Sequence, residues 1–104
     1  YDILKKYGDR VIAVHIHDNL MDYEEFDDYT KDRHMLPFDG KIDYERVCES
    51  IAKSTYNNVV LVEVNRKNFG NPDKYKDLTL LEFLTKAKER ADKIEKMIKE
   101  KREF

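Results

Sequence analysis

Two histidines and an aspartate close an otherwise apolar stretch near the start of the chain. The stretch covers residues 11–19 and reads Val-Ile-Ala-Val-His-Ile-His-Asp-Asn. Because side chains alternate along a strand, His15 and His17 share one face, opposite to Ile16. Imidazoles at the carboxyl end of a parallel strand stand where α/β folds place ligands and metal ions. We therefore favour a chemical role for this sequence over a polar strand end that only meets solvent.

A carboxylate interrupts a second apolar run, Val59–Val64. Glu63 is the only acidic residue inside either of the two apolar strands expected here, over about 10–17 and over Val59–Val64. Such a carboxylate is costly to bury unless it is paired or bound to a metal ion. A divalent ion held by imidazole and carboxylate stabilises the enediolate that forms when a proton leaves the carbon beside a carbonyl. Glu63 is placed to take that proton. Mixed nitrogen and oxygen ligands suit Mn, Zn, Co or Mg, and the sequence does not choose among them.

The elements that position these residues follow a simple alternating order. The patterns predict, in turn, a helix end over 1–7 with Gly8 as its C-cap, a strand over about 10–17, a loop over 18–42, a helix from Asp43, the strand Val59–Val64, a polar loop over 65–77 and a final helix from Thr79.

Capping residues and apolar stripes define the two later helices. Asp43 is a typical N-cap, and Thr79 with Glu82 forms a capping box. The expected stripe of the first of these helices is Tyr44, Val47, Cys48 and Ile51. That of the last helix is Leu81, Leu84, Ala87, Ala91, Ile94 and Met97 or Ile98. We interpret the Lys/Glu-rich opposite face as solvated surface with i,i+4 pairs.

Composition narrows the class of protein. The 104 residues are 40% charged and 40% apolar, with a net charge of −2. The charge balance gives no basic footprint of the kind that binds nucleic acid. No apolar run reaches the length of a membrane span. The single Cys48 rules out an internal disulfide framework and favours a reducing, cytoplasmic location. The start inside an expected helix, without Met or a signal peptide, suggests a fragment.

The order strand, helix, strand, helix predicts a right-handed βαβα unit with parallel strands. Strands that are apolar on both faces need cover on both faces, so further strands should lie outside this chain. The best-fitting whole is a (β/α)₈ TIM barrel of about 250 residues. Residues 1–104 would then be the C-terminal portion of one barrel domain. We expect its exposed strand edges to pair with the rest of the barrel or with other copies.

Three segments resemble the xylose-isomerase-like barrels, which include sugar isomerases, ketose 3-epimerases, inosose dehydratase-like proteins and three-zinc apurinic endonucleases. The segments are His15-Ile-His-Asp18-Asn19, then Asp32-Arg-His34-Met-Leu-Pro-Phe-Asp-Gly40-Lys-Ile-Asp-Tyr44, and the strand containing Glu63. Each is weak alone, but their combination in this order is specific. The resemblance implies that the two strands are strands seven and eight of the barrel.

The resemblance also implies roles for single residues. His15, followed three residues later by Asp18, matches the metal ligand of strand seven. Glu63 matches the strand-eight carboxylate, which is a metal ligand and an acid/base. His17 fills a variable position and either contacts substrate, supports a ligand or is a spare neighbour. Asp32 and His34 match zinc ligands of the endonuclease branch, although we rank them first as substrate-loop residues, with a plain polar loop as the alternative.

The loops after the last two strands of a barrel often hold a substrate phosphate. Four basic residues there are weak candidates for this role, and surface charge is the plainer interpretation of each: Arg33, Lys41, Arg66 and Lys67.

The resemblance has limits that shape the expected function. The family's strand-five Glu and strand-six Asp-x-x-His would precede residue 1, so the chain alone should be inactive. Tyr23 stands where ketose 3-epimerases carry Arg. This difference moves the expectation away from those enzymes and toward sugar-phosphate or uncharacterised isomerase- or epimerase-like members. The expected parent is a divalent-metal-dependent isomerase or epimerase of a small sugar or sugar phosphate. A zinc-dependent apurinic endonuclease is the alternative, and a small α/β module with incidental histidines is a third.

The long loop should cover the barrel mouth as a lid or substrate wall. We expect its half before Asp32 to be the more mobile. In the other half, Leu36 and Phe38 should pack against the barrel so that His34 faces the metal pocket, and Gly40 should give a flexible turn before the helix.

Overall fold

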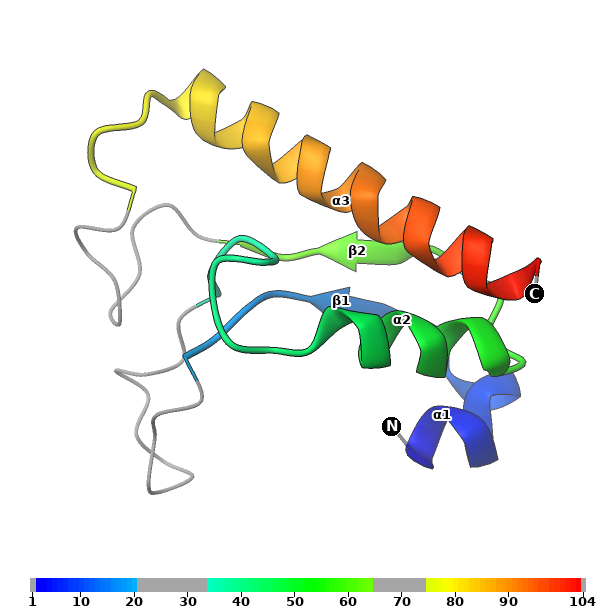
Figure 1. Ribbon diagram of the computed structural model, residues 1–104. Coiled ribbons are helices and arrows are strands. Elements are labelled where there is room, and N and C mark those ends of the chain that lie inside the picture. Colours follow the sequence, from blue (N-terminus) through cyan, green and yellow to red (C-terminus); the bar gives the residue numbers. More distant parts are fainter. Residues whose placement is uncertain (1, 21–33, 65–74, 104) are drawn as a thin grey trace.

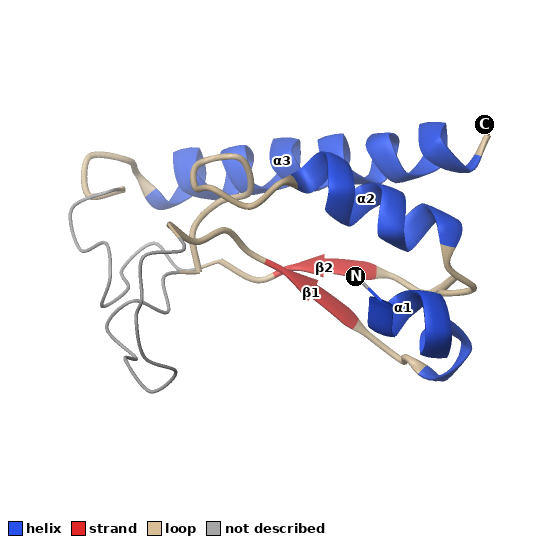
Figure 2. Ribbon diagram, turned by 60° about the horizontal axis from the view of Figure 1, so that its bottom comes forward, coloured by secondary structure: helices blue, strands red, loops and turns tan. Residues whose placement is uncertain are grey.

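The computed structural model describes residues 2–20, 34–64 and 75–103. Its elements are, in chain order, α1 (Asp2–Tyr7), the 3₁₀ helix η1 (Gly8–Arg10), β1 (Val14–Ile16), α2 (Tyr44–Lys53), β2 (Val60–Val62) and α3 (Leu80–Arg102). Helices α2 and α3 lie together over one side of the strand pair, and α1 lies at the end where β1 begins (Figures 1 and 2).

The two strands pair in parallel, as the sequence predicts. Val14, His15 and Ile16 stand opposite Val60, Leu61 and Val62. The Glu63 N–H donates to the Ile16 carbonyl at 2.9 Å, which extends the ladder by one bond. Both strands are shorter than predicted, because a ladder forms only where both backbones lie side by side, and apolar composition extends beyond that stretch.

The main core lies between the strand pair and the helices α2 and α3. Its buried members are Ile16, Tyr44, Cys48, Ile51, Tyr56, Ile94 and Ile98. The predicted stripe of α2 is confirmed, with three of its four members buried and Val47 half-buried. The predicted N-cap is confirmed as well, since the Asp43 side chain accepts from the Arg46 N–H at 3.2 Å. This packing fixes α2 against β1.

Helix α3 has the predicted capping box, and the later part of its predicted stripe is confirmed: Ile94 and Ile98 are buried, and Ala87, Ala91 and Met97 are half-buried. Its first turns differ from the prediction. Thr79 Oγ1 accepts from the Glu82 N–H at 3.1 Å, and Glu82 accepts from the Thr79 N–H at 3.0 Å. Leu81 and Leu84, predicted to be buried, are 75% and 54% exposed. Phe83 is buried in their place, because Leu36 and Tyr75 form a second small core on its side of the helix.

Gly8 directly follows α1, where the sequence predicts the end of the helix, but it does not adopt the left-handed conformation common for glycine at this position. No glycine in the described part of the chain has a positive φ, and Gly8 opens η1 instead. A Cβ at this position would lie 2.9 Å from Thr55 Oγ1 and 3.1 Å from the Tyr56 nitrogen. Gly8 is therefore suited to the close contact with the turn after α2, which no side chain would permit.

One face of the strand pair is open. Val14, Ile16, Val60 and Val62 turn toward the helices, whereas His15, Leu61 and Glu63 are exposed on the opposite face. Burial on both faces, which the sequence predicts, is thus not achieved by the described residues alone. None of the described helices combines the length and the apolar character needed to cross a membrane.

Candidate functional site

His15 and Glu63 meet at the carboxyl ends of the two strands. His15 lies within β1, and Glu63 directly follows β2 on the same face because the register pairs His15 with Leu61. His15 Nδ1 lies 2.6 Å from Glu63 Oε2. Their side chains are 50% and 47% exposed on the open face of the strand pair. The predicted meeting of these two residues at one edge of a parallel pair is confirmed.

His34 comes to the same place from the long loop. Its Nδ1 lies 3.8 Å from Glu63 Oε1, and its side chain is only 17% exposed. The rings of His17 and His34 stack, with 3.9 Å between their centroids and 24° between their planes. His34 therefore faces Glu63 and His17. The stacking makes His17 a direct neighbour of His34. Whether His17 contacts substrate or supports a ligand stays a prediction.

A buried segment after His34 is anchored to the helical layer. Leu36 is fully buried against Tyr75 and Phe83. The Leu36 N–H donates to the Tyr75 hydroxyl at 2.9 Å, and that hydroxyl donates to Asp39 Oδ2 at 2.9 Å. Burial raises the pKa of Tyr75, which keeps the hydroxyl protonated as a donor. The predicted packing of this half of the loop is confirmed.

Two further contacts complete this anchor. Arg90 Nη1 donates to the Pro37 carbonyl at 2.6 Å and to Asp39 Oδ1 at 2.8 Å. Phe38 packs against Tyr44, and Lys93 Nζ lies 4.1 Å from the centroid of the Phe38 ring. Helix α3 thus holds the loop by charge, hydrogen bonding and ring contact together.

Other predicted site residues fall outside this cluster or outside the described part of the chain. Lys41 has an exposed side chain, and its N–H donates to the Asn19 carbonyl at 2.8 Å. The remaining predictions concern residues outside the described ranges: Asp32, Arg33, Arg66, Lys67 and the mobility of the loop before Asp32.

Sequence reasoning missed the residues that hold the loop. Asp18 entered only as part of a motif, yet its carboxylate is buried and accepts three backbone hydrogen bonds. Asp39 and Arg90 were not singled out, although they join the loop to α3. A usable signal exists only for Asp18, because it directly follows the histidine pair.

The donor atoms suit a divalent metal ion in type but not in number. An imidazole nitrogen from His15 and one from His34 lie near the two oxygens of Glu63. Nitrogen and oxygen donors of this kind hold Zn, Mn or Co in proteins. Within residues 2–20, 34–64 and 75–103, however, no group of three His, Cys, Asp or Glu is arranged to hold such an ion. The described residues therefore do not form a metal site by themselves.

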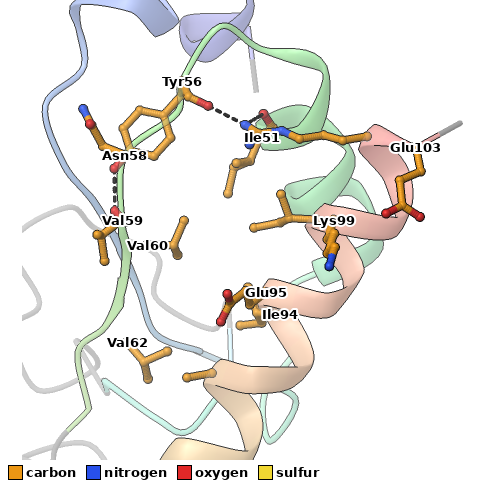
Figure 3. A pocket seen from close by; sticks show the side chains of 13 residues that line it. Ile51, Tyr56, Asn58, Val59, Val60, Val62, Ile94, Glu95, Lys99 and Glu103 are labelled. Atoms are coloured by element: carbon orange, nitrogen blue, oxygen red, sulfur yellow. Dashed lines mark hydrogen bonds between the residues drawn. The ribbon is translucent and has the colours of Figure 1, made fainter.

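A separate apolar pocket lies on the other side of the strand pair. It has a volume of about 500 Å³ between β2 and α3. Val60 and Val62 face Ile94 across it, and Glu95 and Lys99 stand at its rim (Figure 3). The histidines and Glu63 do not line this pocket, so we do not assign it to the candidate site.

Comparison with known proteins identifies the family. A model of the xylose isomerase-like TIM barrel family matches residues 2–98, and the chain belongs to that family. The family includes sugar isomerases and epimerases and endonuclease-like enzymes.

A relative from Sinorhizobium fredii, the uncharacterized protein y4fM, is 43% identical over 54 residues. That match covers 52% of this chain and 15% of the relative. The chain thus corresponds to a small part of that protein. No solved structure matches the chain significantly.

Proposed function

We propose that this chain is the C-terminal part of a divalent-metal-dependent isomerase or epimerase of a sugar or sugar phosphate. In this proposal β1 and β2 are strands seven and eight of the barrel. The observation that carries it is the contact of His15 with Glu63, at 2.6 Å, where two parallel strands end on one open face. Parallel α/β folds bind their substrates at this edge. The activity belongs to the complete parent, since the described residues do not form a metal site by themselves.

His15 and Glu63 would hold the ion, with His34 as a further ligand or a substrate contact. When bound, a divalent ion supplies a Lewis acid for the carbonyl of the sugar. Glu63 accepts the proton from the carbon beside that carbonyl, and His15 fixes the direction of the carboxylate through Oε2. Glu63 then returns the proton to the neighbouring carbon for isomerisation. Epimerisation requires a second acid, which we place outside this chain.

Solvent exchange in the complete parent tests the proton transfer. In D₂O, a sugar or sugar phosphate should gain deuterium at the carbon beside its carbonyl. Glu63→Gln should lower that rate by about 10²–10⁴-fold, the usual contribution of a general base. Asp43→Asn is the matched control, because Asp43 is a surface cap of α2 and should leave the rate unchanged. An unchanged exchange rate in Glu63→Gln would contradict the proposal.

The position of His34 also favours a second candidate, phosphodiester hydrolysis at a zinc cluster. In that case His34, beside Glu63 and His17, would be a zinc ligand rather than a substrate contact. Counting zinc in the purified parent and assaying cleavage of DNA at an apurinic site separates the two. Several zinc ions per chain with DNA cleavage would establish the hydrolase. A single metal ion with deuterium exchange would establish the isomerase or epimerase.

A further inference from the structure

Asp18 is a completely buried acidic residue at the end of β1. Its carboxylate accepts hydrogen bonds from three backbone N–H groups. These belong to Asn19 at 2.8 Å, Gly40 at 2.9 Å and Ile42 at 3.1 Å. A carboxylate without water is tolerated when charge-assisted hydrogen bonds replace its hydration. Two of the three bonds tie the far end of the loop to the strand.

The backbone of the same residue holds the near end of the loop. The Asp18 N–H donates to the Met35 carbonyl at 2.9 Å, and the Met35 N–H donates to the Asp18 carbonyl at 3.0 Å. Asp18 thus holds the segment 35–42 at both of its ends, by main chain at one and by side chain at the other. Met35 directly follows His34, so this pairing also fixes the backbone next to His34.

His34 has a backbone conformation that needs such support. Its φ is 42°, in the left-handed region, which is strained for a residue other than glycine. In this conformation its ring stacks on His17 and lies beside Glu63. A residue held in a strained conformation within a cluster of ionisable side chains requires surroundings that enforce the strain.

Gly40 makes the side-chain half of this support possible. A Cβ there would lie 2.3 Å from the Asn19 carbonyl oxygen and 2.4 Å from Asp18 Oδ1. No side chain larger than hydrogen fits at this distance. The φ of Gly40 is not positive, so glycine is required here for the close approach and not for a left-handed backbone.

We infer that Asp18 is a positioning residue, which holds His34 in its left-handed conformation against His17 and Glu63 by fixing both ends of the segment 35–42. The purpose of this arrangement rests on the proposed function, because only an active site needs His34 at Glu63. The arrangement itself is measurable without any activity.

The contact between the imidazole rings of His17 and His34 is the direct readout. In the chain with isotope-labelled histidine, NMR should detect nuclear Overhauser cross-peaks between the two rings. Asp18→Asn should abolish these cross-peaks. The substitution replaces one carboxylate oxygen, which accepts a hydrogen bond from a backbone N–H, by an amide NH₂ group, which can only donate. Gly40→Ala should abolish the cross-peaks without any change of charge. Asp43→Ala is the matched control, because it removes a hydrogen bond between a carboxylate and a backbone N–H at the start of α2. In this variant the cross-peaks between His17 and His34 should remain.

Circular dichroism of each variant separates positioning from a general role in stability. A residue that only stabilises the fold would lower the unfolding midpoint but leave the ring contact intact in the folded molecules. Retention of the cross-peaks in folded Asp18→Asn or Gly40→Ala would therefore overturn the inference, as would failure of both variants to fold. Loss of the cross-peaks in a folded variant upholds it. Neither result depends on deuterium exchange or DNA cleavage, which test the proposed function alone.

Discussion

At the scale of single residues, the candidate site is separable from the core. His15 and Glu63 are half exposed, whereas the core residue next to His15, Ile16, is 5% exposed and faces the helices. Side chains alternate along β1, so the candidate site residues lie on the exposed face and the core residues on the face toward the helices. His15 and Glu63 can therefore be replaced with little loss of packing. His17 differs, since its ring packs on His34.

His15→Ala in the complete parent should abolish metal-dependent activity while the unfolding free energy changes by less than about 0.5 kcal/mol. The reason is that the variant removes an imidazole at Glu63 but no buried contact. His17→Ala should be milder, because the His17 ring stacks on His34, whereas His15 Nδ1 itself lies 2.6 Å from Glu63 Oε2. Steady-state kinetics and urea unfolding measure both effects. Equal losses of activity in the two variants would mean that the wrong histidine has been assigned.

Because its thiol is buried, Cys48 should make the free energy of unfolding decrease at alkaline pH. Burial raises its pKa from the ordinary 9.0 to about 11. Below pH 9 the thiol is neutral in both the folded and the unfolded chain, so its ionisation does not lower the free energy of unfolding. Between about pH 9 and 11 the unfolded chain loses this proton while the folded chain keeps it, and stability falls by roughly 2–3 kcal/mol. Tyr44 and Tyr75, whose pKa values burial also raises, act in the same direction above pH 10.

Urea midpoints across this pH range measure the effect. Cys48→Ala should reduce the slope of stability against pH between 9 and 10, where the tyrosines contribute least, whatever its absolute stability. A slope identical to that of the parent sequence would show that the thiol is not the group responsible.

The site could be predicted only as far as local rules extend. The meeting of His15 with Glu63 follows from strand alternation and from parallel pairing, and both can be inferred from the sequence. The bonds of Asp18 join it to residues 22 and 24 positions away, which no local period encodes. The left-handed conformation of His34 was equally inaccessible, since nothing in its neighbours favours it.

At the scale of elements, the helices were predicted better than the strands. Caps at Asp43 and Thr79 mark the helix starts chemically, and both were confirmed. A strand end depends on where the partner backbone stops, so both strands proved shorter than their apolar runs. The error in α3 arose because leucines flank Phe83 on both sides, and the position of Leu36 and Tyr75 decides which face of the helix is buried.

Two substitutions in the first turns of α3 test this corrected stripe. Phe83 is 3% exposed and packs with Leu36 and Tyr75, so Phe83→Ala should cost about 3–5 kcal/mol. Leu81 is 75% exposed, and Leu81→Ala should change stability by less than about 0.5 kcal/mol. Urea unfolding of both variants measures the difference. Similar losses of unfolding free energy at the two positions would show that Leu81 is also buried, contrary to the corrected stripe.

At the scale of the whole molecule, the described residues cover the strand pair on one side only. The helices α2 and α3 pack on the face that carries Ile16, while Leu61 and Val59 are 52% and 78% exposed. Two parallel strands also leave a backbone edge without a partner strand on each side, within the described residues. Open edges and exposed apolar side chains favour association with other strands. In the family's barrel architecture, further strands would supply this cover.

The chain by itself should therefore associate through the open face. Sedimentation should show oligomers, and Leu61→Lys should shift them toward monomer, because a charge on the open face must lose its water when copies pack there. Leu84→Lys is the matched control, since Leu84 is 54% exposed but lies on α3, away from this face. A monomer at every concentration would contradict the expected association. Dissociation by Leu84→Lys and not by Leu61→Lys would place the contact on α3 instead, leaving the edge that carries His15 and Glu63 open to solvent.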